Sequence, residues 1–581
     1  MSPKIKSTTH SEELLTGVAM LLCDKAHKHS DVQLKVGGRI FHCHKLILAI
    51  KSPYFEQKFF PSSSSASSSS SSSSAAAKEQ IVLNDISADG FDKVLQFMYT
   101  GETELSDKNV EHILRAADLM KLPELTAFCH CVDYLADRVS VETCPRYWKL
   151  ADQMNLATLA LVCKRQCVKE FGKIRSSSVL GSLSENMMIE LLEDDDLVVE
   201  SEEHVCETLL AWLNSQSNPV QPYQLLTHIR WSGVPVEYVK TKLITNTVLM
   251  TDRQSFEFLS KVISYRLTGV KFYGLNTFHR PSTGVEQCIV VVGLDLGSTL
   301  SSDVYRVNLQ RKELITSMHR IPCKRQMEAT ACVSGNQLYV SGAGERNDEA
   351  WKWEWTFGWV RCADLLRGRR RHCVTFVNNT SMYVLGSFDG KVSLDNIEQY
   401  NTLTNKWTES GQLIQVAWGA ACVVYKTSIY VFGGCEQDDK CLDCVQVFDT
   451  ATKLCTILTQ RLPQPQRLCR AVMWDKSVIL ISYSTCLIFD LEQQTFQQRD
   501  QFAAGSLHFG LAVENQCIFI LGGGMDETDS AGKQTWTCSD EVKSVAVMDI
   551  INNQTTPNWI HHAKLPTPAL LDVFATMTLP A

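Results

Sequence analysis

The second half of the chain is dominated by a repeat, and this repeat limits the possible folds more than any other feature. Short apolar runs that end in glycine or serine recur there, and the intervals between residues 293, 342, 386, 433, 482 and 522 are 49, 44, 47, 49 and 40. The six runs are VVVGLDLG (290–297), LYVSGAGE (338–345), MYVLGSFDG (382–390), IYVFGGCE (429–436), VILISYST (478–485) and IFILGGGMD (518–526). A period of this length is typical of β-propeller blades, so the sequence predicts six blades.

Each predicted blade is a small sheet that cannot bury both of its own faces, so the six units must close into a ring. The apolar run is expected to be an inner strand, buried on both faces, and its glycines allow a tight turn. A third strand follows, as in residues 397–407, and the outer strand begins near an aromatic residue such as Trp407. The apolar tail at 573–580 is predicted to return and pair with the first blade, which makes residues 280–581 one all-β domain.

The first half of the chain has a different pattern. Residues 11–29 predict a helix that carries Leu14, Val18 and Leu21 on one face, and residues 32–36 alternate as a strand does. Gly37-Gly38 predicts a hairpin turn, and a helix follows from His44. Residues 61–77 are nearly all serine and alanine and predict a mobile loop, because such a tract buries little apolar surface. From Gly90 to about residue 265, apolar residues recur at helical spacing.

Composition argues against several classes of function. The net charge of −8 gives no general attraction to nucleic acid or to anionic membranes. No stretch of about 20 apolar residues predicts a membrane span, and the first ten residues have no apolar signal core. The 22 cysteines are scattered through apolar runs and are expected to be small buried hydrophobes rather than a disulfide framework. We therefore expect a cytoplasmic protein, with the nucleus or the cytoskeleton as alternatives.

Several stretches of the first half resemble known domains. SDVQLKVGGRIFHCHKLILAIKSPYF, IVLNDISADGFDKVLQFMYTGE and LRAADLMKLPELTAFC resemble a BTB core, and RYWKLADQMNLATLALVCKRQCVKEF resembles the start of a BACK domain. Together with the predicted blades, the chain resembles the kelch-like family of BTB–BACK–kelch proteins. The resemblance implies a multidomain fold, which comprises a disordered N-terminus (1–10), an α/β BTB domain (11–137, interrupted by the loop at 61–77), an all-α BACK domain (138–270) and an all-β six-bladed kelch propeller (280–581).

The resemblance also implies a function, that of a non-catalytic adaptor in a ubiquitin ligase. In this family the BTB domain forms a homodimer and docks on cullin-3, and the loop face of the propeller binds the substrate protein. The residues implied for dimerisation are Leu14, Val18, Leu21 and Asp31, and those implied for cullin binding are Phe59, Phe60, Glu79 and Tyr99. The cullin-binding loop of the family usually carries a bulky hydrophobe, any residue, then Glu. Here the serine tract fills that loop, and Ala77-Lys78-Glu79 is the nearest candidate.

The segment RGRRRHC (367–373) lies between two blades, where propeller loops open on one rim. Guanidinium groups there can grip acidic residues of a partner in bidentate pairs, and the alternative is a solvated turn or a structural ion pair. The predicted substrate-binding residues are Arg369, Arg370, Arg371, Arg467, Arg470 and His508. The segment WKWEWTFGW places Trp351, Trp353 and Trp355 on one face of a strand, which indicates either a partner-binding surface or packing between blades.

Metal and enzyme functions receive little support from the sequence. His42, Cys43 and His44 are adjacent, and Cys441 and Cys444 form a lone CxxC, but zinc needs four ligands in a consistent spacing. Redox sensing by Cys435, Cys441 or Cys444 is an alternative. We expect no cofactor and no catalytic residue. The competing function is a dimeric, actin-binding cytoskeletal scaffold that does not bind cullin, and a copper oxidase is a third, remote alternative.

Overall fold

The structure is a computed structural model that describes residues 10–23, 29–61, 79–122, 125, 130–175, 179–216, 220–294, 302–308, 314–318, 321–323, 328–334, 337–354, 357–378, 380–528, 534–562, 564–565 and 570–580. The chain forms two compact units, Met1–Ser184 and Glu185–Ala581, and each is described by itself. Disorder was predicted for residues 1–10 and 61–77; of these, 1–9 and 62–77 lie outside the described residues, whereas His10 is the first residue of a helix.

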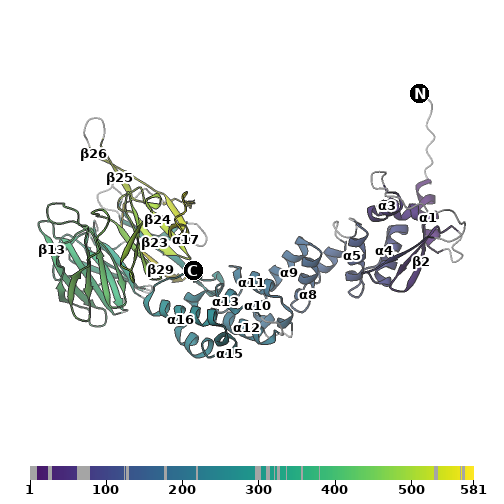
Figure 1. The fold of residues 1–581 in the computed structure, drawn as a ribbon, viewed down its shortest axis with the longest axis horizontal. Coiled ribbons are helices and arrows are strands. Elements are labelled where there is room, and N and C mark those ends of the chain that lie inside the picture. Colours follow the sequence, from purple (N-terminus) through teal and green to yellow (C-terminus); the bar gives the residue numbers. More distant parts are fainter. Residues whose placement is uncertain are drawn as a thin grey trace, which may run out of the picture. The chain divides into compact units, whose positions relative to one another are not determined.

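The first unit begins with a small mixed sheet wrapped by helices (Figure 1). β1 (Val32–Val36) pairs antiparallel with β2 (Arg39–Cys43) and parallel with β3 (Glu79–Leu83). Gly37 and Gly38 make the predicted turn with positive φ angles of 51° and 84°. The alternation in β1 buries Val32, Leu34 and Val36 completely. The surrounding helices are α1 (His10–Cys23), α2 (Lys45–Lys51), α3 (Pro53–Phe59), α4 (Ala88–Thr100) and α5 (Val110–Leu119).

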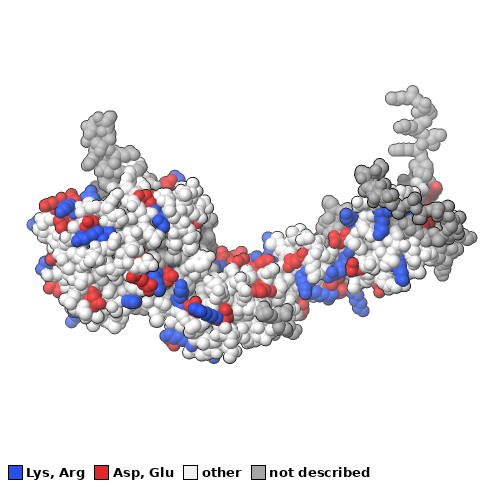
Figure 2. All heavy atoms as spheres, in the orientation of Figure 1, with Lys and Arg blue, Asp and Glu red and all other residues white. Residues whose placement is uncertain are grey.

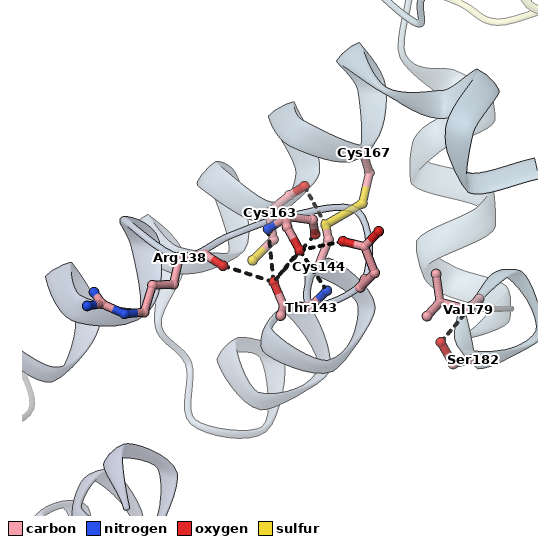
Figure 3. The surroundings of a disulfide bond; sticks show 9 residues. Arg138, Thr143, Cys144, Cys163, Cys167, Val179 and Ser182 are labelled. Carbon is pink, nitrogen blue, oxygen red and sulfur yellow. Dashed lines mark hydrogen bonds between the residues drawn. A yellow bond between two sulfur atoms is a disulfide. The ribbon is translucent and has the colours of Figure 1, made fainter. Parts of the chain in front are cut away.

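Helices continue to the end of this unit, as α7 (His130–Ala136), α8 (Cys144–Gln153), α9 (Ala157–Lys169), α10 (Phe171–Arg175) and a 3-10 turn at Leu180–Ser182. A disulfide joins Cys144 on α8 to Cys167 on α9, with their Cα atoms 6.9 Å apart (Figure 3). The cysteines were predicted to be buried and not to form disulfides; both of these are buried, but the disulfide shows that the second part of the prediction is wrong for this pair. The pairing itself depends on how α8 and α9 pack, which spacing along the chain does not reveal.

The second unit starts with the remaining helices and then changes to strands. The helical elements are α11 (Glu185–Glu193), α12 (Glu202–Ser215), α13 (Pro222–Leu226), a 3-10 turn at Trp231–Gly233, α14 (Val236–Tyr238), a π-helical turn at Val239–Leu243, α15 (Thr247–Thr251) and α16 (Arg253–Thr268). Gly269 ends α16 in the left-handed conformation, with φ 76°. Trp212 and Trp231 are fully buried and form part of the core of this helical region.

Six four-stranded sheets follow, which confirms the six-bladed propeller (Figure 1). From the channel outward they are β29-β4-β5-β6, β7-β8-β9-β10, β11-β12-β13-β14, β15-β16-β17-β18, β19-β20-β21-β22 and β23-β24-β27-β28. The strands are β4 (Val285–Leu294), β5 (Ser302–Asn308), β6 (Leu314–Met318), β7 (Thr330–Ser334), β8 (Gln337–Ala343), β9 (Glu349–Glu354), β10 (Gly358–Arg361), β11 (Cys373–Asn378), β12 (Ser381–Phe388), β13 (Ser393–Asn401), β14 (Lys406–Gln412), β15 (Ala421–Tyr425), β16 (Ser428–Phe432), β17 (Val445–Asp449), β18 (Leu454–Ile457), β19 (Arg470–Trp474), β20 (Ser477–Ile481), β21 (Cys486–Asp490), β22 (Thr495–Gln498), β23 (Gly510–Glu514), β24 (Cys517–Leu521), β27 (Val542–Ala546), β28 (Ile560–His561) and β29 (Leu570–Pro580). A hairpin of β25 (Gly524–Thr528) and β26 (Gln534–Cys538) extends from the sixth blade, which also carries the short helix α17 (Val547–Ile551).

The repeated apolar runs are the second strands of the blades, each followed by a third strand, as predicted. β8, β12, β20 and β24 are buried on both faces, which the runs also predicted. The innermost strands contact one another in the order β29, β7, β11, β15, β19, β23 and back to β29, so the ring is closed. β29 pairs antiparallel with β4 and supplies the innermost strand of the first blade.

The fifth blade lacks the glycine pair of its neighbours and turns in a different way. The Ser482 backbone N–H donates to the Thr485 carbonyl at 2.8 Å, and the Ser482 hydroxyl contacts the Thr485 hydroxyl at 2.7 Å. Gln466 donates to the same Thr485 hydroxyl at 2.6 Å. Side-chain hydrogen bonds therefore stabilise this turn in the fifth blade. In the fourth blade the equivalent turn is made by two glycines, Gly433 and Gly434, with φ angles of 61° and 97°.

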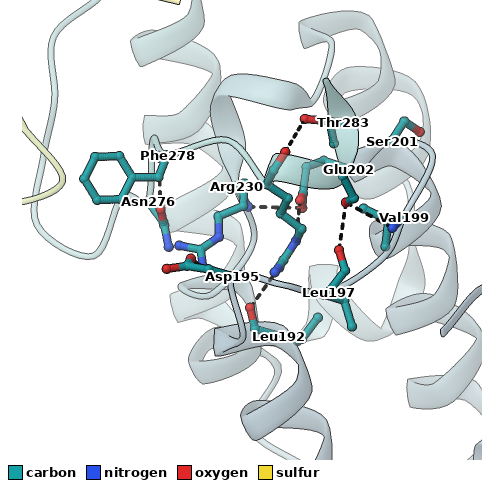
Figure 4. Close-up of polar contacts among 12 residues, drawn as sticks. Leu192, Asp195, Leu197, Val199, Ser201, Glu202, Arg230, Asn276, Phe278 and Thr283 are labelled. Atoms are coloured by element: carbon teal, nitrogen blue, oxygen red, sulfur yellow. Dashed lines mark hydrogen bonds and ion pairs between the residues drawn. The ribbon is translucent and has the colours of Figure 1, made fainter. Parts of the chain in front are cut away.

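Buried charges anchor the segment between the last helix and the first blade (Figure 4). The guanidinium of Arg280 is fully buried and donates to the Glu202 carboxylate at 2.6 Å and to the Asp194 and Leu192 carbonyls at 2.5 and 2.8 Å. Earlier in the same segment, Lys271 and Thr277 both contact the buried carboxylate of Glu514, the last residue of β23. These contacts tie the segment at once to the helices and to the channel strands.

Candidate functional site

The mouth of the propeller channel is built from one residue position that recurs in successive blades. This position lies two residues before each innermost strand, and in each of five blades it has a left-handed backbone, with φ between 51° and 65°. The five residues are Glu328, Arg371, Gly419, Leu468 and His508. Left-handed backbone is uncommon outside glycine, so its recurrence indicates that the blade geometry imposes it.

Backbone hydrogen bonds link these positions from blade to blade. The Arg371 N–H donates to the Glu328 carbonyl at 3.0 Å, Gly419 donates to Arg371 at 2.8 Å, and Leu468 donates to Gly419 at 2.7 Å. A hollow at the channel mouth is lined by the same residues and their neighbours, including Thr330, His372 and Arg470. Side chains that leave this ring are therefore held on a rigid frame.

Two arginines lie against one tryptophan at the channel mouth. The guanidinium carbon of Arg371 lies 5.3 Å from the centre of the Trp418 ring, and that of Arg467 lies 5.9 Å from it. Trp418 is itself buried, and its indole N–H donates to the Glu436 carbonyl at 3.1 Å. Cation–π contacts of this kind orient a guanidinium while they leave its outer edge able to donate hydrogen bonds.

One carboxylate balances the cations on this side of the channel. Glu328 pairs with Arg371 at 2.6 Å and with Arg370 at 3.4 Å. We call Glu328, Arg370, Arg371, Trp418 and Arg467 the channel-mouth cluster. The cluster carries three positive charges and one negative charge, so it favours an acidic partner. Elsewhere, on the face drawn in Figure 2, acidic and basic side chains are mixed on both units.

The other predicted substrate-binding residues offer less exposed side chains than this cluster does. Arg369 is completely buried, where it pairs with the buried Glu398 and donates to the Asn396 side chain at 3.2 Å. Arg369 thus forms a structural ion pair and is not available to bind a partner, in agreement with the alternative interpretation of the arginine run. Arg470 is half-buried and donates to the Phe509 carbonyl at 3.3 Å, and His508 is buried at the channel wall.

His372, the residue after Arg371, is buried beside the cluster. Its imidazole Nε2 lies 2.7 Å from the Thr330 hydroxyl and 2.8 Å from the Ser341 hydroxyl. Burial, together with the charge of Arg369, holds the pKa of His372 well below its ordinary value, so the ring is neutral at physiological pH. It therefore acts as a hydrogen-bonding spacer between two blades and not as an additional cation.

Sequence reasoning missed Glu328 and Trp418. Both belong to the repeat. Glu328 is itself a left-handed position, and Trp418 stands one residue before such a position, as Arg370 and Arg467 do in the neighbouring blades. Aligning the blades on that position would have brought these three residues together. Trp351 and Trp353, in contrast, lie in the hydrophobic core between the first two blades, as the packing interpretation held, and Trp355 lies outside the described residues.

The residues predicted for cullin binding differ in their environments. Phe60 is 56% exposed, and Phe59 is half-buried and stacked on Phe55. The backbone of Glu79 begins β3, whereas its side chain lies outside the described residues. Tyr99 is buried, its hydroxyl accepts from the His44 backbone N–H at 3.0 Å, and burial raises the pKa of Tyr99. Tyr99 therefore holds the start of α2 in place and is not itself part of an exposed binding surface.

The residues predicted for dimerisation lie on α1 and just before β1. Leu14 is 56% exposed, and Val18 and Leu21 are half-buried. Asp31 is exposed, and its carboxylate accepts from the Lys45 backbone N–H at 2.8 Å, at the first turn of α2. The structure adds Leu46 and Ile50 on α2, which are 64% and 73% exposed. The sequence feature that could have identified them is that α2 is apolar on every side, so the domain core can bury only one of its faces and leaves the other exposed.

In the described part of the chain, no group of three or more His, Cys, Asp or Glu side chains is placed to hold a metal ion. The helices described above include none with the length and apolar character that crossing a bilayer requires.

Comparison with known proteins agrees with this architecture. Family models match for the BTB/POZ domain (residues 22–136), for "BTB And C-terminal Kelch" (144–243) and for the Kelch motif (369–413 and 419–460). Kelch-like protein 24 of Rattus norvegicus is 25% identical over 89% of this chain and 84% of its own length. Kelch-like protein 25 of Xenopus tropicalis is 23% identical over 86% of both chains, and Kelch-like protein 6 of Homo sapiens is 24% identical over 70% of this chain and 65% of its own.

A BTB domain, a BACK domain and a closed propeller in one chain define a class of modular binding proteins, the BTB–BACK–kelch proteins. Proteins of this class are adaptors for cullin-3 and are in general not enzymes. Within this class, the chain belongs to the kelch-like family.

Proposed function

We propose that this chain is a substrate adaptor of a cullin-3 ubiquitin ligase, which binds an acidic segment of its substrate at the channel-mouth cluster. The observation that carries the proposal is the pair of guanidiniums oriented by Trp418 on the rim of a closed propeller. Arg467 is exposed and Arg371 is 31% exposed, so each can donate further hydrogen bonds to a carboxylate. The adaptor raises the concentration of substrate near the ligase and does no chemistry itself.

The BTB domain contributes dimerisation in this proposal. Leu14, Leu15 and Met20 on α1 and Leu46 and Ile50 on α2 are all more than half exposed. Exposed apolar side chains on two helices of one domain are costly in water, and a second copy of the domain would cover them. The resulting dimer offers two propellers, so a substrate with two acidic segments binds with avidity.

Cullin docking is assigned to the end of α3 and to the start of β3. Phe60 supplies an exposed aromatic anchor there, and Tyr99 acts indirectly by holding the His44 end of α2 in place. Such an anchor matches the chemistry of interface hot spots, which are aromatic groups that become buried on binding. We place the assembly in the cytoplasm.

The experiment that tests this function measures binding of the purified full-length chain to purified cullin-3 by isothermal titration calorimetry. We expect binding by the wild type and at least a tenfold loss for Phe60→Ala. Phe357→Ala, at a 78% exposed position of the propeller, is the matched control and leaves the affinity unchanged. Undetectable binding by the wild type would refute the adaptor, and co-sedimentation of that same protein with actin filaments would then favour the scaffold.

A further inference from the structure

The loop between β16 and β17 of the fourth blade brings two thiols into contact. The Sγ atoms of Cys435 and Cys441 lie 3.3 Å apart. Cys435 is buried and Cys441 is half-exposed, and the residues between them include the exposed stretch Gln437–Lys440. A third cysteine of this loop, Cys444, packs instead into the core between the third and fourth blades.

The backbone around these two residues is ordered as a short antiparallel ladder. The Leu442 N–H donates to the Gly434 carbonyl at 2.8 Å on one side of the pair, and the Glu436 N–H donates to the Lys440 carbonyl at 3.0 Å on the other. Cys435 and Cys441 are therefore directly opposite each other as a pair without mutual backbone hydrogen bonds. In such pairs the Cα atoms are about 4.5 Å apart, within the range of about 4.4 to 6.8 Å that a disulfide spans.

Bond formation thus needs only side-chain movement. The two sulfurs must approach from 3.3 Å to the disulfide bond length of about 2.05 Å, which rotation of the two side chains supplies while the ladder stays in place. We propose that Cys435 and Cys441 form a modification site, a dithiol that peroxide converts to an intramolecular disulfide.

The order of reaction follows from the exposure of the two thiols. Cys441 is the accessible one, so its thiolate attacks a peroxide oxygen, gains that oxygen as a sulfenic acid and releases hydroxide, which takes up a proton. The Cys435 sulfur then attacks the sulfenic sulfur, the S–O bond breaks, and a second water leaves with the thiol proton. The sum is two thiols and one hydrogen peroxide giving one disulfide and two waters, and a reducing thiol reverses it.

Burial raises the pKa of Cys435 to about 12 in the reduced state, and its contact with Cys441 adds to this rise. The guanidinium of Arg467 acts in the opposite direction and lowers it. Oxidation of Cys441 replaces the neighbouring thiol by a sulfenic acid, and Arg467 remains beside Cys435 to favour its thiolate.

The site does not depend on the proposed function, but its location beside the channel-mouth cluster couples the two. Cys435 exchanges both backbone hydrogen bonds with Trp418, at 2.9 and 3.1 Å, and the Trp418 indole donates to the next residue, Glu436. A disulfide at Cys435 therefore fixes the loop that holds Trp418, against which Arg371 and Arg467 lie.

The test treats the reduced full-length protein with hydrogen peroxide and maps its cysteines by mass spectrometry. Trypsin cleaves after Lys440, so the disulfide would join peptides 427–440 and 441–453, and fragment ions separate Cys441 from Cys444. We expect this linked pair in the wild type, its loss on treatment with dithiothreitol, and at least tenfold faster oxidation of Cys441 than of Cys455, a thiol of the same blade with the same intermediate exposure.

Variants separate the two steps. Cys441→Ser removes the linked pair, Cys435→Ser leaves Cys441 as a sulfenic acid that dimedone traps, and the control Cys455→Ser forms the linked pair as the wild type does. Independent oxidation of the two cysteines in the wild type, with no linked peptides, would overturn the proposal even if a variant failed to fold. Cullin binding is measured separately, so failure of one proposal leaves the other standing.

Discussion

Replacing Arg280 by methionine should release the segment that joins the helices to the propeller. The substitution keeps much of the length of the side chain, but it removes three hydrogen bonds and the counter-charge of Glu202, which is 1% exposed. Breaking a buried ion pair by removing one partner costs about 3–5 kcal/mol. A second estimate of this cost agrees with the first. The stranded Glu202 carboxylate can escape its unpaired charge by taking up a proton, and protonating a carboxyl of ordinary pKa 4.5 at pH 7 costs about 3.4 kcal/mol.

Hydrogen exchange of the full-length protein measures this cost directly. The reporter is the Trp231 amide, which donates to the Asn276 carbonyl at 2.9 Å. A loss of about 3–5 kcal/mol corresponds to exchange that is roughly 150- to 5,000-fold faster, provided that local opening exposes the amide. Burial already raises the pKa of Glu202, and loss of Arg280 raises it further, so the variant loses more stability as the pH rises from 5 to 8.

Two variants make the interpretation specific. Adding Glu202→Gln to Arg280→Met removes the stranded charge, so the double variant should exchange more slowly than Arg280→Met alone. Arg253→Met is the matched control, because Arg253 is 90% exposed and its pairing with Glu257 is worth little. Exchange of Arg280→Met within fivefold of the wild type, or no recovery in the double variant, would show that this ion pair does not hold the segment.

Four further results are expected. Arg369→Met should destabilise the propeller by about 3–5 kcal/mol in urea unfolding, because it strands the buried Glu398, whereas Arg371→Met should change stability by less than about 1 kcal/mol. In affinity capture with the full-length chain, Arg371→Ala with Arg467→Ala should reduce recovery of acidic partners at least tenfold, and unchanged recovery would contradict the assignment of the channel-mouth cluster. Tyr99→Phe should cost about 1–3 kcal/mol in thermal unfolding, since it leaves the His44 amide without its acceptor. Burial lowers the pKa of His279 from 6.5 to about 4, so as the pH falls His279 is protonated in the unfolded chain before it is protonated in the folded protein. Wild-type stability should therefore drop by about 2 kcal/mol between pH 7 and pH 5. His279→Gln should remove that part of the drop, as measured by urea titrations at both pH values.

The periodic features of the sequence predicted the fold well. Alternation in Val32–Val36, the Gly37-Gly38 turn and the six apolar runs each report a local preference that the final structure keeps. The fifth repeat forms a blade even though Ser482 and Thr485 occupy its turn in place of glycine, because neighbouring blades impose the geometry and hydrogen bonds stabilise the turn.

The candidate site was less predictable, because burial there depends on partners that are distant in the sequence. Arg369 and Arg371 belong to the same run of arginines, yet Glu398 draws the first into the interior and Glu328 holds the second at the surface. The role of Trp418 likewise depends on Arg371 and Arg467, which come from the preceding and following blades. Composition cannot distinguish such residues, whereas an alignment of the blades on their left-handed positions partly can.

Pairing of β29 with β4 means that the first blade cannot be completed until the end of the chain has been synthesised. β4 ends at residue 294 and its partner begins at residue 570, so the innermost position of the first blade stays vacant while the intervening chain is translated. At roughly 5–20 residues per second this wait is on the order of 15 to 55 s, during which an apolar strand edge is open to other nascent chains. Ribosome-associated chaperones that shield such edges should therefore matter more for the yield of this protein than for a domain whose strands pair as they emerge.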